Sequence, residues 1–213
     1  MINVIFDMDG TLLDTQKIYV PAWEEAGRLQ GVEGMGELAP HVCGTNNETC
    51  KEIVYANYPS IVYDVIKKDV HKYVEKNCVV IFKKGAKELL DFLKAKNIKF
   101  GLASGTERGP LMERLIAVGA EKDFEAIVCG SEVEKGKPHP EVFLKTAELM
   151  GVDPETCIVF EDSPLGIRAA ATAGMKPVGI FDIAPFDEVR HLMYKELNHL
   201  GEAIQMIEEM INS

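Results

Sequence analysis

The chain has 213 residues, of which 46% are hydrophobic and 27% charged, so it can bury a substantial core as one domain or as a core with a smaller insertion. Its formal net charge of −11 disfavours nonspecific binding to nucleic acid or anionic membranes, and no apolar run approaches membrane-spanning length. The five cysteines are odd in number without Cys-x-x-Cys spacing, and the N-terminus has no signal-peptide pattern. We therefore expect a cytoplasmic protein that binds neither nucleic acid nor membranes, and we take a monomer as the default state.

The first predicted element is a short strand that ends in two carboxylates. Residues 4–6 form a β-branched and aromatic run typical of a buried strand. Asp7 and Asp9 follow at i and i+2, so strand alternation places both on one side of the chain. Two like charges in one place are costly, and a positive group must offset them. Gly10 allows the sharp turn that follows.

Residues 15–78 have helical rather than strand-like spacing. A helix is expected near Pro21, a second from Asn46 or Asn47 to Asn57, and a third after Ser60. An apolar stripe is expected on the third helix, formed by Val62, Val65, Ile66, Val70, Tyr73 and Val74. The region reads as a small helical cap inserted after the first strand.

From residue 79 the pattern alternates between helix and strand. Helices are predicted over residues 85–96, 108–118, 140–150 and 164–173, and strands over residues 98–103, 126–129, 157–160 and 177–181. One or two helices are expected after the last of these strands. Strands separated by helices predict βαβ units, and hence an α/β fold with a Rossmann-like parallel sheet flanked by helices.

Polar residues directly follow several of these strands. Ser104 and Thr106 follow the second strand, and Glu161 and Asp162 follow the fourth, as Asp7 and Asp9 follow the first. Lys137 lies in the loop after the third strand. Because ligands of such sheets bind beyond the carboxyl ends of the strands, these groups are expected to share one edge.

The chain resembles the haloacid dehalogenase-like phosphatases in four segments, in order. These are Asp-Met-Asp-Gly-Thr at residues 7–11, Leu-Ala-Ser-Gly-Thr at 102–106, Gly-Lys-Pro-His-Pro-Glu at 136–141 and Phe-Glu-Asp-Ser-Pro-Leu-Gly-Ile at 160–167. The helical insert resembles the cap of the β-phosphoglucomutase-like branch. The resemblance implies a catalytic core of residues 1–14 and 79–213 and a cap of residues 15–78.

Counting charges indicates a divalent cation at this edge. Up to four negative charges come together, and Lys137 alone cannot balance them. The candidate ligands are all oxygens, with no His or Cys among them, so a hard ion such as Mg²⁺ fits better than zinc. The resemblance implies that the side chains of Asp7 and Asp162 bind the metal, that Glu161 assists, and that Asp9 contributes its backbone carbonyl.

The resemblance also implies a division of chemical roles. Asp7 would attack phosphorus and carry an aspartyl-phosphate, while Asp9 would protonate the leaving oxygen and then activate water. Ser104, the backbone at Gly105 and the ammonium of Lys137 would hold the phosphate oxygens.

The cap distinguishes phosphatase from mutase by resemblance. In β-phosphoglucomutases the cap carries a histidine, where this chain has Tyr19, and an arginine after a Lys-Gly-Val-Ser stretch, whereas residues 43–47 here read Cys-Gly-Thr-Asn-Asn. Without that arginine the cap loses a bidentate grip on a second phosphate. Hydrolysis is therefore favoured over phosphotransfer. Tyr19, Trp23, Asn46 and Asn47 are the cap residues expected to face the substrate, although Tyr19 and Trp23 at i, i+4 spacing could equally be a core pair.

We expect a Mg²⁺-dependent phosphomonoester hydrolase that acts on a small phosphorylated metabolite, with a sugar phosphate as the leading substrate class. Two alternatives stay open: phosphotransfer of the β-phosphoglucomutase type, and a non-catalytic protein that binds a phosphorylated ligand. The second would be favoured by the loss of a catalytic aspartate, and both Asp7 and Asp9 are present.

Overall fold

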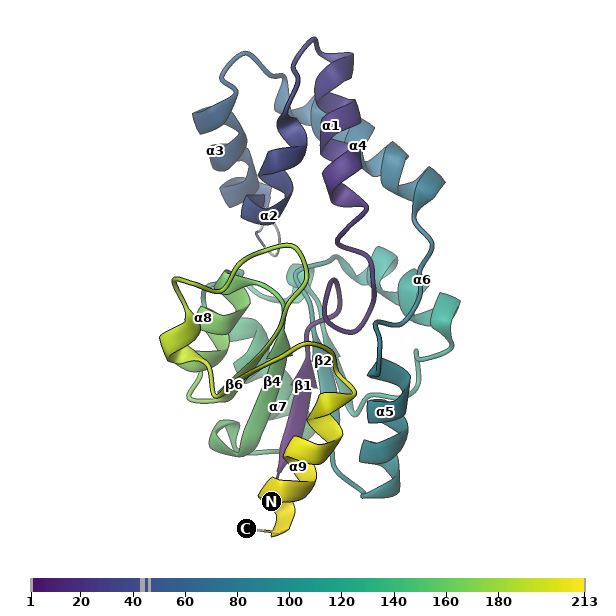
Figure 1. Ribbon diagram of the computed structural model, residues 1–213, viewed down its shortest axis with the longest axis vertical. Coiled ribbons are helices and arrows are strands. Elements are labelled where there is room, and N and C mark those ends of the chain that lie inside the picture. Colours follow the sequence, from purple (N-terminus) through teal and green to yellow (C-terminus); the bar gives the residue numbers. More distant parts are fainter. Residues whose placement is uncertain (1, 43–44, 46, 213) are drawn as a thin grey trace.

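The centre of the protein is a parallel sheet, seen in a computed structural model that describes residues 2–42, 45 and 47–212 (Figure 1). Its strands lie in the order β3-β2-β1-β4-β5-β6. Their bounds are β1 (Asn3–Phe6), β2 (Phe100–Ala103), β3 (Ala126–Val128), β4 (Cys157–Glu161), β5 (Lys176–Ile180) and β6 (Lys195–Leu197). Val4 pairs with Phe100 on one side and Ile158 on the other, so β1 is central. The Rossmann-like fold is therefore confirmed.

Helices cover both faces of the sheet, and the apolar side chains of β1 are buried on each face. Val4 and Phe6 belong to one core cluster with residues of α5 (Ala86–Ala95), α6 (Arg108–Val118) and α9 (Glu202–Asn212). Ile5, which points the other way, packs with α7 (Glu141–Met150) and α8 (Pro164–Thr172). An unbroken apolar run with alternating directions is what a strand buried on both faces requires.

The inserted helices form a cap with its own hydrophobic core, above the carboxyl ends of the strands in Figure 1. They are α1 (Tyr19–Leu29), the 3-10 helix η1 (Met35–Leu38), α2 (Ala39–Val42), α3 (Asn47–Asn57) and α4 (Tyr63–Asn77). Trp23, Val54 and Ile66 are buried together in this second core. The expected helical cap is thus present, while its proposed boundaries at residues 15 and 78 stay a prediction.

Two segments connect the cap to the sheet, and they run side by side. Leu13 and Phe82 form an isolated antiparallel bridge. The N–H of Asp14 donates to the carbonyl of Ile81 (3.0 Å), and that of Lys83 to the carbonyl of Leu12 (2.9 Å). The chain therefore leaves the core for the cap and returns from the cap to the core at neighbouring positions. None of the helices in the described part of the chain combines the length and apolarity needed to span a membrane.

Two expectations from the sequence are wrong in detail. α4 begins after Val62 rather than at a Ser60 cap, and its buried face holds Tyr63, Ile66, Val70 and Val74, whereas Val62 and Val65 are exposed. A sixth strand, β6, follows the expected last one. It is three residues long at the sheet edge, and its first two side chains are exposed, so its sequence carries no apolar signal. Short 3-10 helices occur at Gly130–Glu132 (η2), Pro154–Thr156 (η3) and Arg190–Leu192 (η4).

Candidate active site

The strands deliver the polar residues expected from the sequence to one edge of the sheet, beneath the cap. Asp7 follows β1, Ser104 follows β2, Lys137 lies beyond β3, and Glu161 and Asp162 end and follow β4. All five are buried, with exposed fractions between 1% and 6%. They line a cavity of about 770 Å³ that extends into the cap. This volume is ordinary for a small-molecule site, for which roughly 300–1,000 Å³ is usual.

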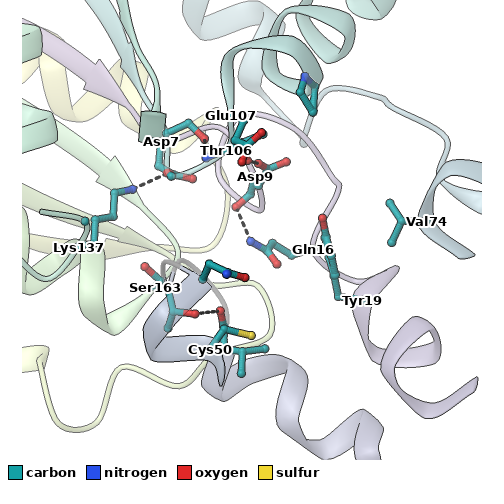
Figure 2. Close-up of a pocket in the computed structure, with 18 of the residues that line it drawn as sticks. Asp7, Asp9, Gln16, Tyr19, Cys50, Val74, Thr106, Glu107, Lys137 and Ser163 are labelled. Carbon is teal, nitrogen blue, oxygen red and sulfur yellow. Dashed lines mark hydrogen bonds and ion pairs between the residues drawn. The ribbon is translucent and has the colours of Figure 1, made fainter. Parts of the chain in front are cut away.

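The ammonium of Lys137 links two of the carboxylates. Its Nζ lies 2.5 Å from Asp7 Oδ1 and 2.5 Å from Glu161 Oε1 (Figure 2 shows the bond to Asp7). The other carboxylate oxygen of Glu161 accepts from the N–H (2.7 Å) and Oγ (2.8 Å) of Ser163. Ser163 is also the N-cap of α8 and accepts from the Gly166 N–H (3.0 Å). The start of α8 therefore fixes Glu161, and Glu161 fixes Lys137.

The turn after β1 brings Asp162 against the first motif. Thr11 Oγ1 donates to Asp162 Oδ1 at 3.0 Å. Gly10 has a φ of +88°, and a Cβ at this position would lie 2.2 Å from Asp162 Oδ2. Only glycine satisfies both the left-handed backbone and this close approach.

The loop after β2 is built around Ser104. The Ser104 N–H donates to the Val128 carbonyl (3.0 Å), and its Oγ accepts from the Thr106 N–H (3.1 Å). Gly105 follows and lines the cavity. A Cβ on Gly130 would come within 2.2 Å of the Gly105 carbonyl oxygen, so the two loops are closely packed. Hydroxyl and N–H groups of such a loop are suited to bind an anion.

The buried carboxylates of this cluster outnumber the one buried cation, Lys137. Whether a metal ion fits the site can be judged from this imbalance and from the atoms available to bind it. Burial raises the pKa of Asp7 to about 8, and that of Asp162 well above its ordinary value. Burial opposes the charge of Lys137, yet Asp7 and Glu161 raise its pKa above the usual one. Within the described residues, no three His, Cys, Asp or Glu side chains form a metal-holding group by themselves. The all-oxygen donors and the excess negative charge nevertheless fit a hard divalent ion.

Asp9 is held by several donors. Its Oδ1 accepts from Thr15 Oγ1 (2.5 Å), and its Oδ2 from Thr106 Oγ1 (2.7 Å). The backbone carbonyl accepts from Gln16 Nε2 at 3.2 Å, as Figure 2 shows. The guanidinium of Arg114, from α6, forms an ion pair with Oδ1. The side chain of Asp9 is therefore fixed at the floor of the cavity, between the core and the first cap helix.

Comparison with known proteins now identifies the family. The family model described as haloacid dehalogenase-like hydrolase matches residues 4–180. The chain belongs to the haloacid dehalogenase-like hydrolases. The four segments quoted from the sequence all lie within the match, and the expected enzyme family is confirmed.

Relatives with phosphatase and mutase names are similar to most of this haloacid dehalogenase-like chain. A phosphorylated carbohydrates phosphatase of Thermotoga maritima is 35% identical over 82% of both chains. A β-phosphoglucomutase of Bacillus subtilis is 30% identical over 83% of this chain and 82% of the relative. A HAD family hydrolase of Deinococcus radiodurans R1, solved with bound phosphate and sodium, is 25% identical, with a TM-score of 0.79 over 97% of this chain and 95% of the other. The chain is thus a phosphatase-family enzyme of the β-phosphoglucomutase-like branch.

The cap of this haloacid dehalogenase-like hydrolase contributes three of the four residues expected from the sequence. Tyr19, Trp23 and Asn47 line the cavity, while Asn46 lies outside the described residues. Trp23 is only 3% exposed and also belongs to the cap core, so this residue can both line the cavity and pack in the core. Asn47 Oδ1 accepts from the Tyr63 hydroxyl (3.1 Å) and from Lys67 Nζ.

The sequence did not indicate several cavity residues. Lys67, His71 and Glu75 lie at i, i+4, i+8 on α4 and line the cavity. This spacing is a usable signal, because it places them beside the buried stripe of the same helix. Arg114 had no such signal, since its contact with Asp9 joins segments 105 residues apart.

Proposed function

We propose that this hydrolase is a Mg²⁺-dependent phosphomonoesterase that acts through an aspartyl-phosphate on a small phosphorylated metabolite, with a sugar phosphate as the leading class. The observation that carries the proposal is the buried cluster at the carboxyl end of β1. In it Lys137 contacts Asp7, and Asp9 follows two residues later in the chain. The name of the Thermotoga maritima relative supports the sugar-phosphate class.

In the first step, a carboxylate oxygen of Asp7 attacks phosphorus. The bond from Asp7 to phosphorus forms, the bond to the leaving oxygen breaks, and that oxygen takes a proton from Asp9. Lys137 holds positive charge beside Asp7 and can offset the charge of the transferring group, and Ser104 can donate to its oxygens.

In the second step, Asp9 takes a proton from a water molecule, whose oxygen attacks phosphorus. The bond between Asp7 and phosphorus breaks, inorganic phosphate leaves, and both carboxyl groups return to their starting states. The cap residues that line the cavity limit the access of bulk water during these steps.

The metal would be held by Asp7 and Asp162 through their side chains, with Glu161 nearby and the backbone carbonyl of Asp9 as a further oxygen. Mg²⁺, when bound, would reduce the repulsion between the carboxylates and the phosphate dianion. Asp162 is positioned for this by Thr11, and Glu161 by Ser163.

The mutase alternative is carried by the relative from Bacillus subtilis, which is named β-phosphoglucomutase. The cap position that carries a histidine in such mutases by resemblance is Tyr19 in this chain, and its hydroxyl accepts from Arg114 (3.3 Å). Burial raises the pKa of Tyr19, so the hydroxyl stays protonated at neutral pH. A neutral phenol is a poor proton acceptor, which favours hydrolysis over phosphotransfer.

The proposal is tested by phosphate release from glucose 1-phosphate, glucose 6-phosphate and p-nitrophenyl phosphate, with Mg²⁺ or with EDTA. We expect Mg²⁺-dependent release that Asp7→Asn lowers at least about 10³-fold, because the nucleophile is lost. Asp91→Asn is the matched control, since Asp91 is an exposed carboxylate on α5. Conversion of β-glucose 1-phosphate to the 6-phosphate without net release would establish the mutase instead. No release from any substrate would favour the non-catalytic binding protein.

A further inference from the structure

Arg114 is a partly buried cation that the family motifs leave without a role. It lies on α6, at the wall of the cavity, with 15% of its side chain exposed. Leu111 and Leu115 of the same helix are fully buried in the core, so the backbone at Arg114 is held rigidly against the sheet. The guanidinium forms an ion pair with Asp9 Oδ1, and its Nη2 lies 3.3 Å from the Tyr19 hydroxyl.

We propose that Arg114 is a positioning residue that holds the carboxyl group of Asp9 in line with the leaving oxygen of the substrate. This rests on the proposed function, in which Asp9 donates the proton as the bond between phosphorus and the leaving oxygen breaks. The proton passes from protonated Asp9 to that oxygen, and the ion pair with Arg114 belongs to the carboxylate that Asp9 then becomes, so no other reactant is required.

The contacts of Asp9 show why the arginine matters most among its side-chain partners. Thr15 and Thr106 each supply one neutral hydroxyl, and each hydroxyl donates to one of the two carboxyl oxygens of Asp9. Arg114 supplies a charged donor, so it adds a Coulombic attraction to the Asp9 carboxylate that the two neutral hydroxyls lack. Only 11% of the Asp9 side chain is exposed, so water weakens this pair less than it weakens a surface pair.

Arg114 also connects Asp9 to the cap. Tyr19 is the first residue of α1, so its hydroxyl belongs to the cap, whereas Arg114 and Asp9 belong to the core. The guanidinium therefore lies between the acid and the element that covers it. With the cap in the described position, Arg114 has fixed partners on both sides.

The test compares two leaving groups, because p-nitrophenolate leaves readily without a proton and a sugar alkoxide does not. For Arg114→Gln we expect kcat/KM for the best sugar phosphate of the panel to fall about 10- to 100-fold, within the range general acid catalysis supplies. For p-nitrophenyl phosphate, kcat/KM should change less than about threefold, since this ratio reports only the steps up to phosphoryl transfer.

Four further variants keep the test decisive. Arg108→Gln removes another arginine of α6, which pairs with Glu132 outside the cavity, and should leave the ratio of the two kcat/KM values unchanged. Adding Arg114→Gln to Asp9→Asn should not change that ratio further, because the acid is already absent. Arg114→Lys keeps the charge, so it provides a folded variant should the glutamine variant unfold, and its ratio should lie between those of wild type and Arg114→Gln.

Each outcome separates this inference from the proposed function. An equal loss on both substrates, or an unchanged sugar-phosphate rate, would overturn the positioning role while wild-type activity upholds the phosphatase. A further drop of the ratio in the Asp9→Asn background would also overturn it. A wild-type protein that hydrolyses neither substrate would overturn the proposed function and this inference together.

Discussion

Burial raises the pKa of Asp7 to about 8 even though Lys137 donates to it, so the stability of the metal-free protein must depend on pH. In the unfolded chain this carboxyl has a pKa near 3.8. Between about pH 4 and pH 8 the folded protein thus binds more protons than the unfolded one, and the free energy of unfolding falls as the pH rises. Asp162, whose pKa burial also raises, adds to the same slope.

Asp7→Asn should flatten this slope and, in EDTA at pH 8, make the protein more stable than wild type. The amide carries no charge to desolvate, and Lys137 keeps its contact with Glu161. Urea unfolding at pH 5, 6.5 and 8 measures the effect, with Asp91→Asn as the surface control. A variant that is less stable than wild type at pH 8 would show that the ion pair of Asp7 outweighs its burial.

At the residue scale, the sequence could predict which polar residues lie at the carboxyl ends of the strands, but it could not predict every residue that contacts them. Asp7, Ser104 and Glu161 were predictable to lie together because each follows a strand, and parallel strands end at one edge. Arg114 was not predictable, because a helix face carries several polar residues and only packing decides which one turns into the cavity. The roles assigned to the cluster stay predictions.

At the scale of elements, the first turn of α8 packs directly against Glu161, and Gly166 makes room for that carboxylate. A Cβ on Gly166 would lie 1.8 Å from Glu161 Oε1, so Gly166→Ala must displace the carboxylate that contacts Lys137. We expect a loss of about 1–3 kcal/mol in the free energy of unfolding, as for other overpacked sites. Phosphate release should fall as well, because Lys137 loses the partner that places it beside Asp7.

Gly109→Ala is the matched control for this prediction. Gly109 lies in the first turn of α6, and a Cβ there would meet nothing within 4 Å. The substitution should stabilise the protein by about 0.5–1 kcal/mol through the lower entropy of the unfolded chain. Urea unfolding and phosphate release of both variants provide the comparison. Equal effects of the two alanines would contradict the close contact at Gly166.

The comparison of expected and observed elements shows which of them the sequence pattern can predict. The helices α5 to α8 were predictable within one or two residues at either end, because apolar periodicity and glycine stops mark them. β6 was not, since a three-residue edge strand with two exposed side chains pairs through its backbone alone. The start of α4 was misplaced because Ser60 is a good capping residue that the structure does not use as the cap.

At the scale of the whole molecule, the excess of acidic residues that gives the net charge of −11 is also present in the lining of the cavity. The lining outside the four motifs includes the exposed carboxylates of Glu75, Glu107, Glu113 and Glu134. Among the described residues that line this part of the cavity, Lys67 and Arg114 are the only lysine or arginine side chains opposite these carboxylates, and Arg114 already pairs with Asp9. The rest of the cavity is therefore suited to a neutral group, under the proposed function in which the phosphate binds at the Lys137 cluster.

This imbalance predicts that a second phosphate on the substrate is disfavoured, and that salt relieves the effect. At low ionic strength we expect kcat/KM for glucose 1,6-bisphosphate to be at least about tenfold below that for glucose 6-phosphate, and the gap to narrow at 0.3 M NaCl as screening shortens the range of the repulsion. Glu107→Gln with Glu113→Gln should narrow the gap at low salt, whereas Glu208→Gln, which removes an exposed carboxylate of α9, should not. A bisphosphate that is preferred at every salt concentration would contradict this electrostatic selection, and would instead match a cavity that accepts two phosphates, as mutase chemistry requires.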